Sequence, residues 1–214
     1  MVNLLSGLFL YTLALHCFVA SFAANTKNIT TDKSSLLAFQ LQITSEPNNL
    51  LANNWSTTSS VCSWVGVTCD DRHGRVHSLN LTNMGLRGTV SPNLGNLSFL
   101  VTLDLSHNTF VGQFPKEICR LRRLKFLEIS NNEFNGGVPT KLGDLSQLQH
   151  LYIAANNFSG LIPQSIGNLR GLTILDASSN GFSGHIPQTI SNMSSLEYLR
   201  LDINYFSGTP SFFV

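Results

Sequence analysis

The chain has 214 residues, of which 43% are hydrophobic and 12% are charged, and its formal net charge is +1. These values describe an ordinary globular chain with enough apolar content to form a core. A nucleic-acid partner usually requires a clustered basic face, so the near-neutral charge argues against DNA or RNA binding.

Residues 1–23 are predicted to be a secretory signal peptide. An apolar stretch runs from Leu4 to Ala20, and Ser21 and Ala23 place small residues where a signal peptidase cuts. The alternative is an uncleaved anchor, since the stretch is nearly long enough to span a bilayer, but polar interruptions within it favour cleavage. No other segment is apolar enough to cross a membrane, so we expect the mature chain to lack a span and to reach the extracellular space or the plasma-membrane surface.

Residues 24–74 are expected to form an N-terminal cap. The segment Asp32–Phe39 (DKSSLLAF) predicts the start of a helix, with Asp32 or Thr31 capping its free amides. Its inward-facing residues are predicted to be Leu36, Leu37, Phe39, Leu41 and Ile43. Trp55 and Trp64 are expected to cover the hydrophobic end of the structure that follows.

Three cysteines remain once Cys17 leaves with the signal peptide. Cys62 and Cys69 lie close together in an exported chain, where a disulfide is the expected pairing. Cys119 is left over, and no motif around it indicates catalysis or metal binding. We therefore predict a Cys62–Cys69 disulfide in the cap and a buried free thiol at Cys119.

Residues 75–214 carry a repeat with a period of 24 residues. Five columns keep this step, and two of them are Asn108, Asn132, Asn156, Asn180 and Asn204, and Phe110, Phe134, Phe158, Phe182 and Phe206. The shared pattern L-x-x-L-x-L-x-x-N-x-F identifies the segment as leucine-rich repeats. Five whole turns begin at Val76 and at every twenty-fourth residue after it, and a partial sixth begins at Leu196.

Each column has a physical role in the predicted fold, which is an α/β solenoid. The leucines point inward around a short strand, and successive strands stack into a parallel concave sheet with a spacing of about 4.8 Å. The asparagine amide can satisfy buried backbone groups, and the phenylalanines can stack as a spine. The x-Pro pairs predict an extended segment, and Ile166 and Leu169 a short helix or 3₁₀ turn. The partial sixth turn is expected to be the softest.

Glycosylation and a basic run are the remaining local signals. Six N-x-[ST] sequons predict glycosylated, solvent-facing asparagines at Asn28, Asn54, Asn80, Asn96, Asn157 and Asn192. The run Arg120–Lys125 (RLRRLK) is interpreted as the solvated edge of one repeat, with a polyanion-binding patch as the alternative.

The chain resembles the ectodomains of plant leucine-rich-repeat receptor-like kinases. The resemblance is carried by D-x-x-x-L-L-A-F (Asp32–Phe39), by CSWVGVTC (Cys62–Cys69) and by the L-x-G-x-I-P form of the repeats. Residues 75–105 are most similar to the immune subgroup that includes receptors for bacterial flagellin and elongation-factor peptides. The resemblance implies a ligand-sensing role in defence or development signalling. Such receptors add more repeats, a transmembrane helix and a kinase, none of which is in this sequence.

No enzyme motif is present. The kinase signatures G-x-G-x-x-G, H-R-D and D-F-G are missing, and the histidines fall in different columns of the repeat, so neither catalysis, a metal site nor a cofactor is predicted. Binding is expected instead on the exposed strand positions of the concave face. The predicted ligand-binding residues are Phe126, His150, Tyr152, Ile174, Asp176, Tyr198 and Arg200.

The expected partner is a peptide or protein ligand, with a co-receptor ectodomain as a further candidate. Two alternatives to a receptor ectodomain stay open at this point. One is a short soluble repeat protein that acts as a decoy, scaffold or co-receptor partner. The other is an inhibitor of a secreted pathogen enzyme, in the manner of polygalacturonase-inhibiting proteins.

Overall fold

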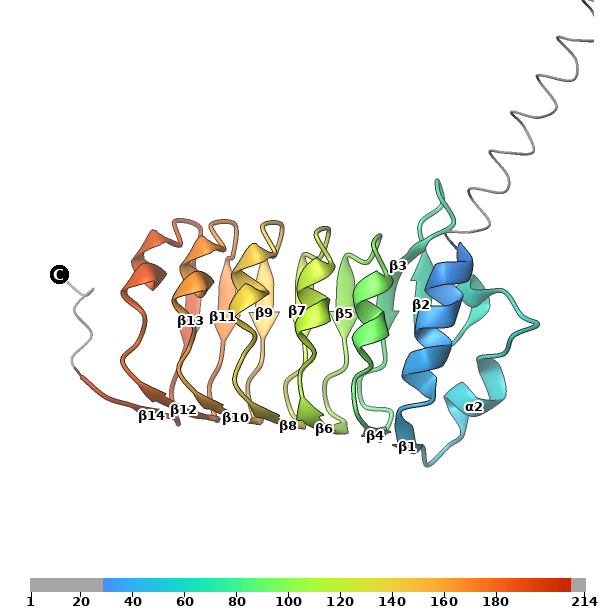
Figure 1. Cartoon of the computed structure of the whole chain (residues 1–214), viewed down its shortest axis with the longest axis horizontal. Coiled ribbons are helices and arrows are strands. Elements are labelled where there is room, and N and C mark those ends of the chain that lie inside the picture. The colour runs from blue at the N-terminus through green and yellow to red at the C-terminus, as the bar shows by residue number, and fades with distance from the viewer. Residues whose placement is uncertain (1–28, 209–214) are drawn as a thin grey trace, which may run out of the picture.

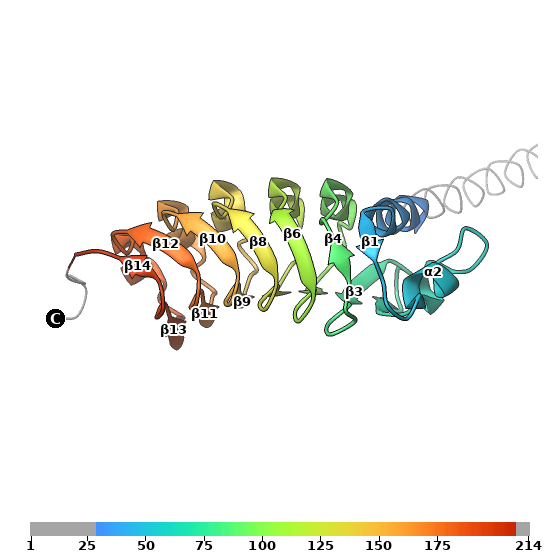
Figure 2. The same cartoon turned by 90° about the horizontal axis from the view of Figure 1, so that it is seen from below.

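The computed structural model describes residues 29–208, which form a bowed stack of turns behind an N-terminal cap (Figure 1). The predicted signal peptide and Asn28 lie outside these residues. Two seven-stranded sheets run the length of the stack. Figure 2 shows the first sheet on the inner side of the bow and the short helical segments on its outer side.

The first sheet is the predicted concave sheet. Its strands are β2 (Val67–Cys69), β3 (Val76–Asn80), β5 (Thr102–Asp104), β7 (Phe126–Glu128), β9 (His150–Tyr152), β11 (Ile174–Asp176) and β13 (Tyr198–Arg200). All pairs are parallel except β2 with β3, where the cap adds an antiparallel strand. Leu103, Leu127 and Leu151 are paired in register, so residues 24 apart lie side by side as predicted.

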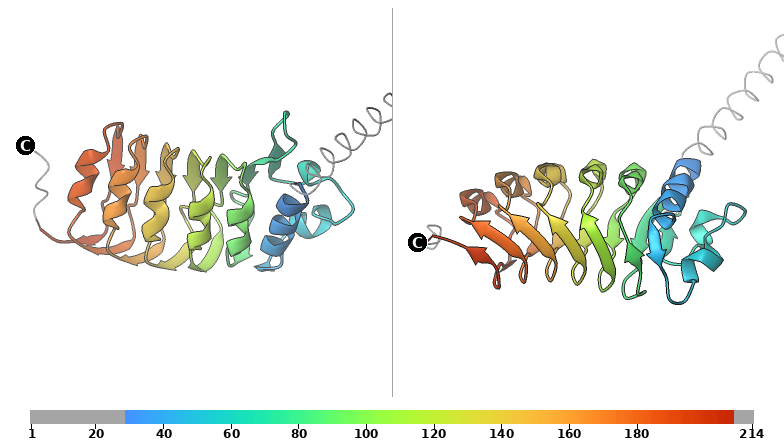
Figure 3. Two further views of the ribbon diagram at one scale, coloured as in Figure 1. Left: turned by 45° about the horizontal axis from the view of Figure 1, so that its top comes forward. Right: turned by 60° about the horizontal axis from the view of Figure 1, so that its bottom comes forward.

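The second sheet was not predicted. Its strands are β1 (Ile43–Ser45), β4 (Arg87–Gly88), β6 (Thr109–Gln113), β8 (Glu133–Gly136), β10 (Asn157–Gly160), β12 (Gly181–Gly184) and β14 (Tyr205–Phe206). Each of β6, β8, β10 and β12 contains a phenylalanine of the spine and a glycine with positive φ, between 74° and 83°. Because the left-handed conformation suits glycine, the strand can turn away at this residue. Figure 3 shows this sheet between the concave strands and the outer segments.

The outer side consists of short 3₁₀ helices, as the i, i+3 spacing predicted. They are η2 (Pro92–Asn96), η3 (Lys116–Arg120), η4 (Thr140–Asp144), η5 (Gln164–Asn168) and η6 (Gln188–Asn192). The cap contributes a first helix that includes residues 29–40, α2 (Leu50–Asn54) and η1 (Val61–Ser63).

Asparagines and phenylalanines hold neighbouring turns together. The Asn132 amide donates to the Leu105 carbonyl of the preceding turn at 3.0 Å, and its oxygen accepts from the Phe110 amide at 3.0 Å. The rings of Phe110 and Phe134 stack with centroids 6.2 Å apart, and the spacing to Phe158 is 6.1 Å. The predicted ladder and spine are therefore confirmed.

The cap closes the N-terminal end, but one of its polar residues acts differently from the prediction. Asp32 does not cap its own helix; its carboxylate is fully buried and accepts two bonds from the Arg75 guanidinium, both 2.7 Å, and one from the Val76 amide at 3.0 Å. It thus ties the cap to the first turn of the repeats. Leu41, predicted to face inward, is 82% exposed because the helical residues end at position 40.

The two tryptophans of the cap and the three cysteines match the predictions. Trp55 and Trp64 are buried and stack on each other with ring centroids 5.2 Å apart. Cys62 and Cys69 form a disulfide, and Cys119 is a buried free cysteine.

One interface between neighbouring turns, here called the looser seam, is packed less closely than the others. In η2, η4 and η5 a glycine lies where an added Cβ would clash with a backbone carbonyl of the next turn, and Gly143 against Ser165 is one example. The equivalent residue of η3 is Cys119, and η3 and η4 pack less closely than the other neighbouring pairs (Figure 1). A side chain in the glycine column therefore separates two turns.

Candidate functional site

Two columns of exposed or half-buried side chains line the concave sheet. Parallel register places Phe126 beside His150, and Ile174 beside Tyr198. The same register places Tyr152 beside Asp176, and Asp176 beside Arg200. The structure thus brings all seven predicted ligand-binding residues onto one face.

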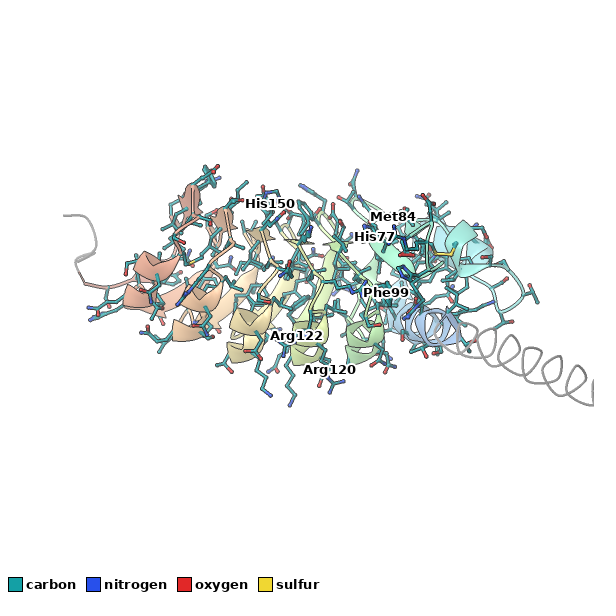
Figure 4. The ribbon with its side chains drawn as sticks, turned by 90° about the horizontal axis from the view of Figure 1, so that it is seen from above. His77, Met84, Phe99, Arg120, Arg122 and His150 are labelled. Carbon is teal, nitrogen blue, oxygen red and sulfur yellow. A yellow bond between two sulfur atoms is a disulfide. The ribbon has the colours of Figure 1, made fainter. Side chains whose placement is uncertain are left out.

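Three aromatic side chains meet at the middle of this face. The Phe126 ring lies 5.8 Å from His150, edge to face, and 5.8 Å from Tyr152, while His150 and Tyr152 are 6.4 Å apart. His150 is seen among the concave strands in Figure 4. Such contacts hold the rings in defined orientations, so the cluster offers a rigid apolar surface to a ligand.

Carboxylates surround the aromatic cluster. Asp104 accepts from the Ser106 amide at 3.0 Å, and Glu128 from the Ser130 amide at 3.0 Å. Partial burial raises the pKa of Glu128, and the nearby Asp104 charge raises it further. Burial likewise raises the pKa of Tyr152, with a contribution from Glu128. The column therefore places negative charges close together at positions that are partly shielded from water.

Arg200 is engaged within the protein rather than free for a ligand. Its guanidinium lies 3.8 Å from Asp176 and 3.0 Å from Asp202. The hydrogen bond from Arg200 lowers the pKa of the Asp202 carboxyl. Asp202 was not predicted to belong to the site, although it follows Arg200 by two residues at the end of β13.

A groove with a volume of about 550 Å³ runs across these strands. Phe126, Tyr152, Asp176 and Arg200 line it, whereas His150, Ile174 and Tyr198 lie beside it. Sequence reasoning missed two further columns of lining residues, which follow the strands: Ser106, Ser130, Ala154 and Ser178, and His107, Asn131, Ala155 and Ser179. The serines recur at multiples of 24 residues, so their period could have revealed them.

Residues 29–208 contain neither a metal-binding cluster nor a membrane-spanning helix. No group of three or more His, Cys, Asp or Glu side chains in this part of the chain could hold a metal ion. Among the same residues, no helix has the length and apolarity needed to span a bilayer.

The sequon asparagines lie on several faces. Asn80, Asn96, Asn157 and Asn192 are exposed, and Asn80 belongs to the concave column of Asp104 and Glu128. Asn54 is half-buried, and its side-chain oxygen accepts from the Val65 amide at 2.6 Å. Glycosylation of these asparagines stays a prediction.

Family models match most of the described chain. The leucine rich repeat N-terminal domain matches residues 29–70, and leucine rich repeat models match residues 99–121, 123–145 and 146–206. The LRR receptor-like serine/threonine-protein kinase EFR of Arabidopsis thaliana is 40% identical over 107 residues, which are 50% of this chain and 10% of that relative. The chain therefore spans a small part of such a receptor.

Two solved structures from Arabidopsis are similar over most of this chain. The BIR2 ectodomain is 32% identical with a TM-score of 0.75, and the match covers 84% of this chain and 95% of that one. The receptor kinase HAESA, solved with the peptide hormone IDA and the co-receptor SERK1, is 31% identical with a TM-score of 0.60. That match covers 80% of this chain and 33% of HAESA.

Proposed function

Because this chain belongs to the leucine-rich-repeat ectodomains of plant receptor kinases, we propose that it senses a peptide or protein ligand at the cell surface. It is a non-catalytic binding module of the extracellular or plasma-membrane surface. The observation that carries the proposal is the ordered aromatic cluster of Phe126, His150 and Tyr152 on the concave sheet.

The ligand class follows from the two columns. An extended segment laid along the stack meets exposed side chains at intervals of about 4.8 Å, because that is the spacing of adjacent strands. Phe126, Tyr152 and Tyr198 supply aromatic contacts, which dominate many protein interfaces. Asp104 and Glu128 favour basic side chains at the ligand's other face, whereas Asp176 is already paired with Arg200. The ligand is therefore an extended peptide with apolar and basic residues.

Delivery and domain organisation are part of the same proposal. Residues 1–23 direct secretion, residues 24–74 cap the stack and residues 75–214 form the repeats. The buried pairing of Asp32 with Arg75 supports the cap boundary, since it joins the two parts across residue 74. In the secretory pathway the exposed sequons become glycosylated; digestion with an N-glycosidase tests this by a shift in mass.

Selection from a phage-displayed random peptide library tests the binding function. The library is selected against the secreted chain, and binding of the selected peptides is measured by calorimetry. The combined substitution of Phe126→Ala, Tyr152→Ala and Tyr198→Ala should weaken binding by about tenfold or more. The control carries Leu161→Ala and Tyr205→Ala, which remove exposed apolar side chains outside the concave sheet, and it should bind normally. Equal loss in both proteins, or no loss in either, would place the binding surface elsewhere.

A second candidate is supported by the near-complete coverage of a short ectodomain. Because this chain spans 95% of the BIR2 ectodomain, its described part has the size of a whole short ectodomain. On this second proposal, the chain acts as the partner of a larger receptor rather than as the primary sensor of the ligand. Selected peptides that bind only when a second ectodomain is present would favour this role.

A further inference from the structure

An ordered stack of cationic and aromatic groups reaches the edge of the solenoid beside the cap. The guanidinium carbon of Arg75 lies 4.6 Å from the Phe99 ring centroid, and that of Arg123 lies 4.0 Å from it. The His73 ring is 5.0 Å from the same ring. Figure 4 shows Phe99 between the strand side, where His150 lies, and the outer side, where Arg120 and Arg122 project.

The inner end of this stack is fixed. Arg75 is buried, and its guanidinium is held by Asp32 through two hydrogen bonds of 2.7 Å and also contacts Ser98 at 3.3 Å. Because the Arg75 guanidinium is buried and hydrogen-bonded, it gives the Phe99 ring an ordered platform on that side. Arg123 stacks on the same ring, so its guanidinium is held in place before any ligand arrives.

Carboxylates offset part of the charge in this stack, and Asp70 lies 2.7 Å from the His73 ring nitrogen. Asp32 offsets Arg75, and Asp144 lies 3.6 Å from the neighbouring Arg122. Within residues 29–208, Arg123 and Lys125 have neither a carboxylate partner nor a hydrogen-bond acceptor for their side chains. Both are exposed because Leu121 and Leu124 anchor the loop in the core.

We infer that Phe99, Arg123 and Lys125, here called the cationic edge, dock an acidic segment of a partner protein. A fixed guanidinium presents a planar fork of donors that matches a carboxylate in a bidentate geometry. Lys125 adds a second charge two residues along the chain. This surface is separate from the concave groove, so it gives the chain a second binding site in addition to the proposed ligand site.

Charges around the edge favour a short acidic segment over a long polyanion. Asp104 and Glu128 lie on the adjoining strands and Asp144 lies in η4 of the next turn. Charge interactions in solution reach about 8 Å at physiological ionic strength, so a long anionic chain would meet these carboxylates. A protein segment with two or three Asp or Glu residues can contact the cations and then leave the surface.

Binding of a short synthetic peptide of alternating Asp and Glu to the full secreted chain tests the inference. Fluorescence anisotropy is measured for the native chain and for single variants at low ionic strength. Arg123→Gln should weaken binding by about fivefold. Phe99→Leu should weaken it similarly although it removes no charge, because the guanidinium loses its platform. Phe99→Tyr keeps the ring and should bind like the native chain.

Lys141→Gln is the matched control, since it removes one exposed cation from the outer side of the next turn. Native-like binding by this variant, together with the losses at positions 123 and 99, supports the cationic edge. Equal loss in Arg123→Gln and Lys141→Gln would show attraction by net charge alone and would overturn the inference. Tighter binding of a galacturonic-acid oligosaccharide than of the peptide would also overturn it, in favour of a polysaccharide. Thermal unfolding of each variant verifies that it is folded.

Discussion

The first and last described turns of the stack use the same residue columns but bury them differently. Val76, Leu79 and Leu81 in the first turn are fully buried under the cap. Their equivalents in the last turn, Leu196, Leu199 and Leu201, are only partly buried. A repeat obtains its stability from its neighbours, so a turn that is packed on both sides is expected to resist opening more than one packed less completely.

Polar contacts follow the same gradient. At the first turn a buried carboxylate, a guanidinium and a backbone amide are joined in one network at Asp32. At the last turn the exposed Arg200 forms ion pairs with Asp202, which is also exposed, and with Asp176, which is half-buried. Exposed ion pairs contribute little to stability, whereas breaking a buried one leaves an uncompensated charge. The loss of one partner of an ion pair is therefore expected to cost more stability at the first turn than at the last.

The largest effect is expected at the buried pair. Asp32→Ala should lower the free energy of unfolding by about 3–5 kcal/mol, because Arg75 is then buried without its partner. Urea denaturation of the purified chain measures the change. Asp71→Ala, which removes an exposed carboxylate within the cap, is the control and should change stability by less than about 0.5 kcal/mol. Similar losses in the two variants would contradict the role given to Asp32.

The asparagine ladder allows the two regions to be compared with identical bonds. Asn132 and Asn204 each donate to three carbonyls and accept from one amide, but Asn132 is buried and the Asn204 site is partly open. Asn132→Ala should cost about 2–3 kcal/mol and Asn204→Ala about half of that, since water can replace the lost bonds at the open site. Denaturation midpoints test the ranking, and equal costs would argue against a gradient.

A smaller effect of opposite sign is expected at Ile203. This residue is 71% exposed and has φ of 55°, a left-handed conformation that is unfavourable for a β-branched side chain. Its equivalents in the first and third turns are Asn83 and Asn131. Ile203→Asn should therefore stabilise the last turn by about 1 kcal/mol and raise the melting temperature by about 2–4 °C. A lower melting temperature would mean that Ile203 makes contacts that outweigh its backbone strain.

The smallest expected effect concerns the looser seam at Cys119. Burial, together with the charge of Asp144, raises the pKa of its thiol from 9.0 to about 11. The neutral thiol is favoured in the folded state, so its contribution to stability is present below pH 9 and is lost as the pH rises towards 11. Iodoacetamide should label Cys119 in the unfolded chain but not in the folded chain. The Cys62–Cys69 disulfide should stay intact in both states. Rapid labelling of Cys119 in the folded chain at pH 8 would show that the seam opens.

Periodic residues made most of the fold predictable. The leucine, asparagine and phenylalanine columns each have one structural role, so their spacing alone indicates the concave strands, the ladder and the spine. The second sheet was missed because its strands are short and contain glycine, and such residues do not show the alternation typical of a strand. The sequence predicts a local helix cap at Asp32 or Thr31, because Arg75, the actual partner of Asp32, lies 43 residues away and no local pattern connects the two.

The candidate site was predictable as a surface but not as a set of contacts. Register follows from the period, and it correctly placed Phe126, His150 and Tyr152 together. Sequence spacing carries no information on which charges neutralise each other, so the engagement of Arg200 by Asp202 and the free charge of Arg123 emerge only from side-chain positions.

Hydrogen exchange with and without a selected peptide tests the central claim, that the concave sheet is the binding surface. Mass spectrometry of the glycosylated chain follows exchange in the strands of both sheets. Added protection should be confined to the concave strands β5, β7, β9, β11 and β13 and to the loops that follow them, with β6, β8, β10 and β12 unchanged. Protection centred on the second sheet or on the outer 3₁₀ helices would contradict the claim.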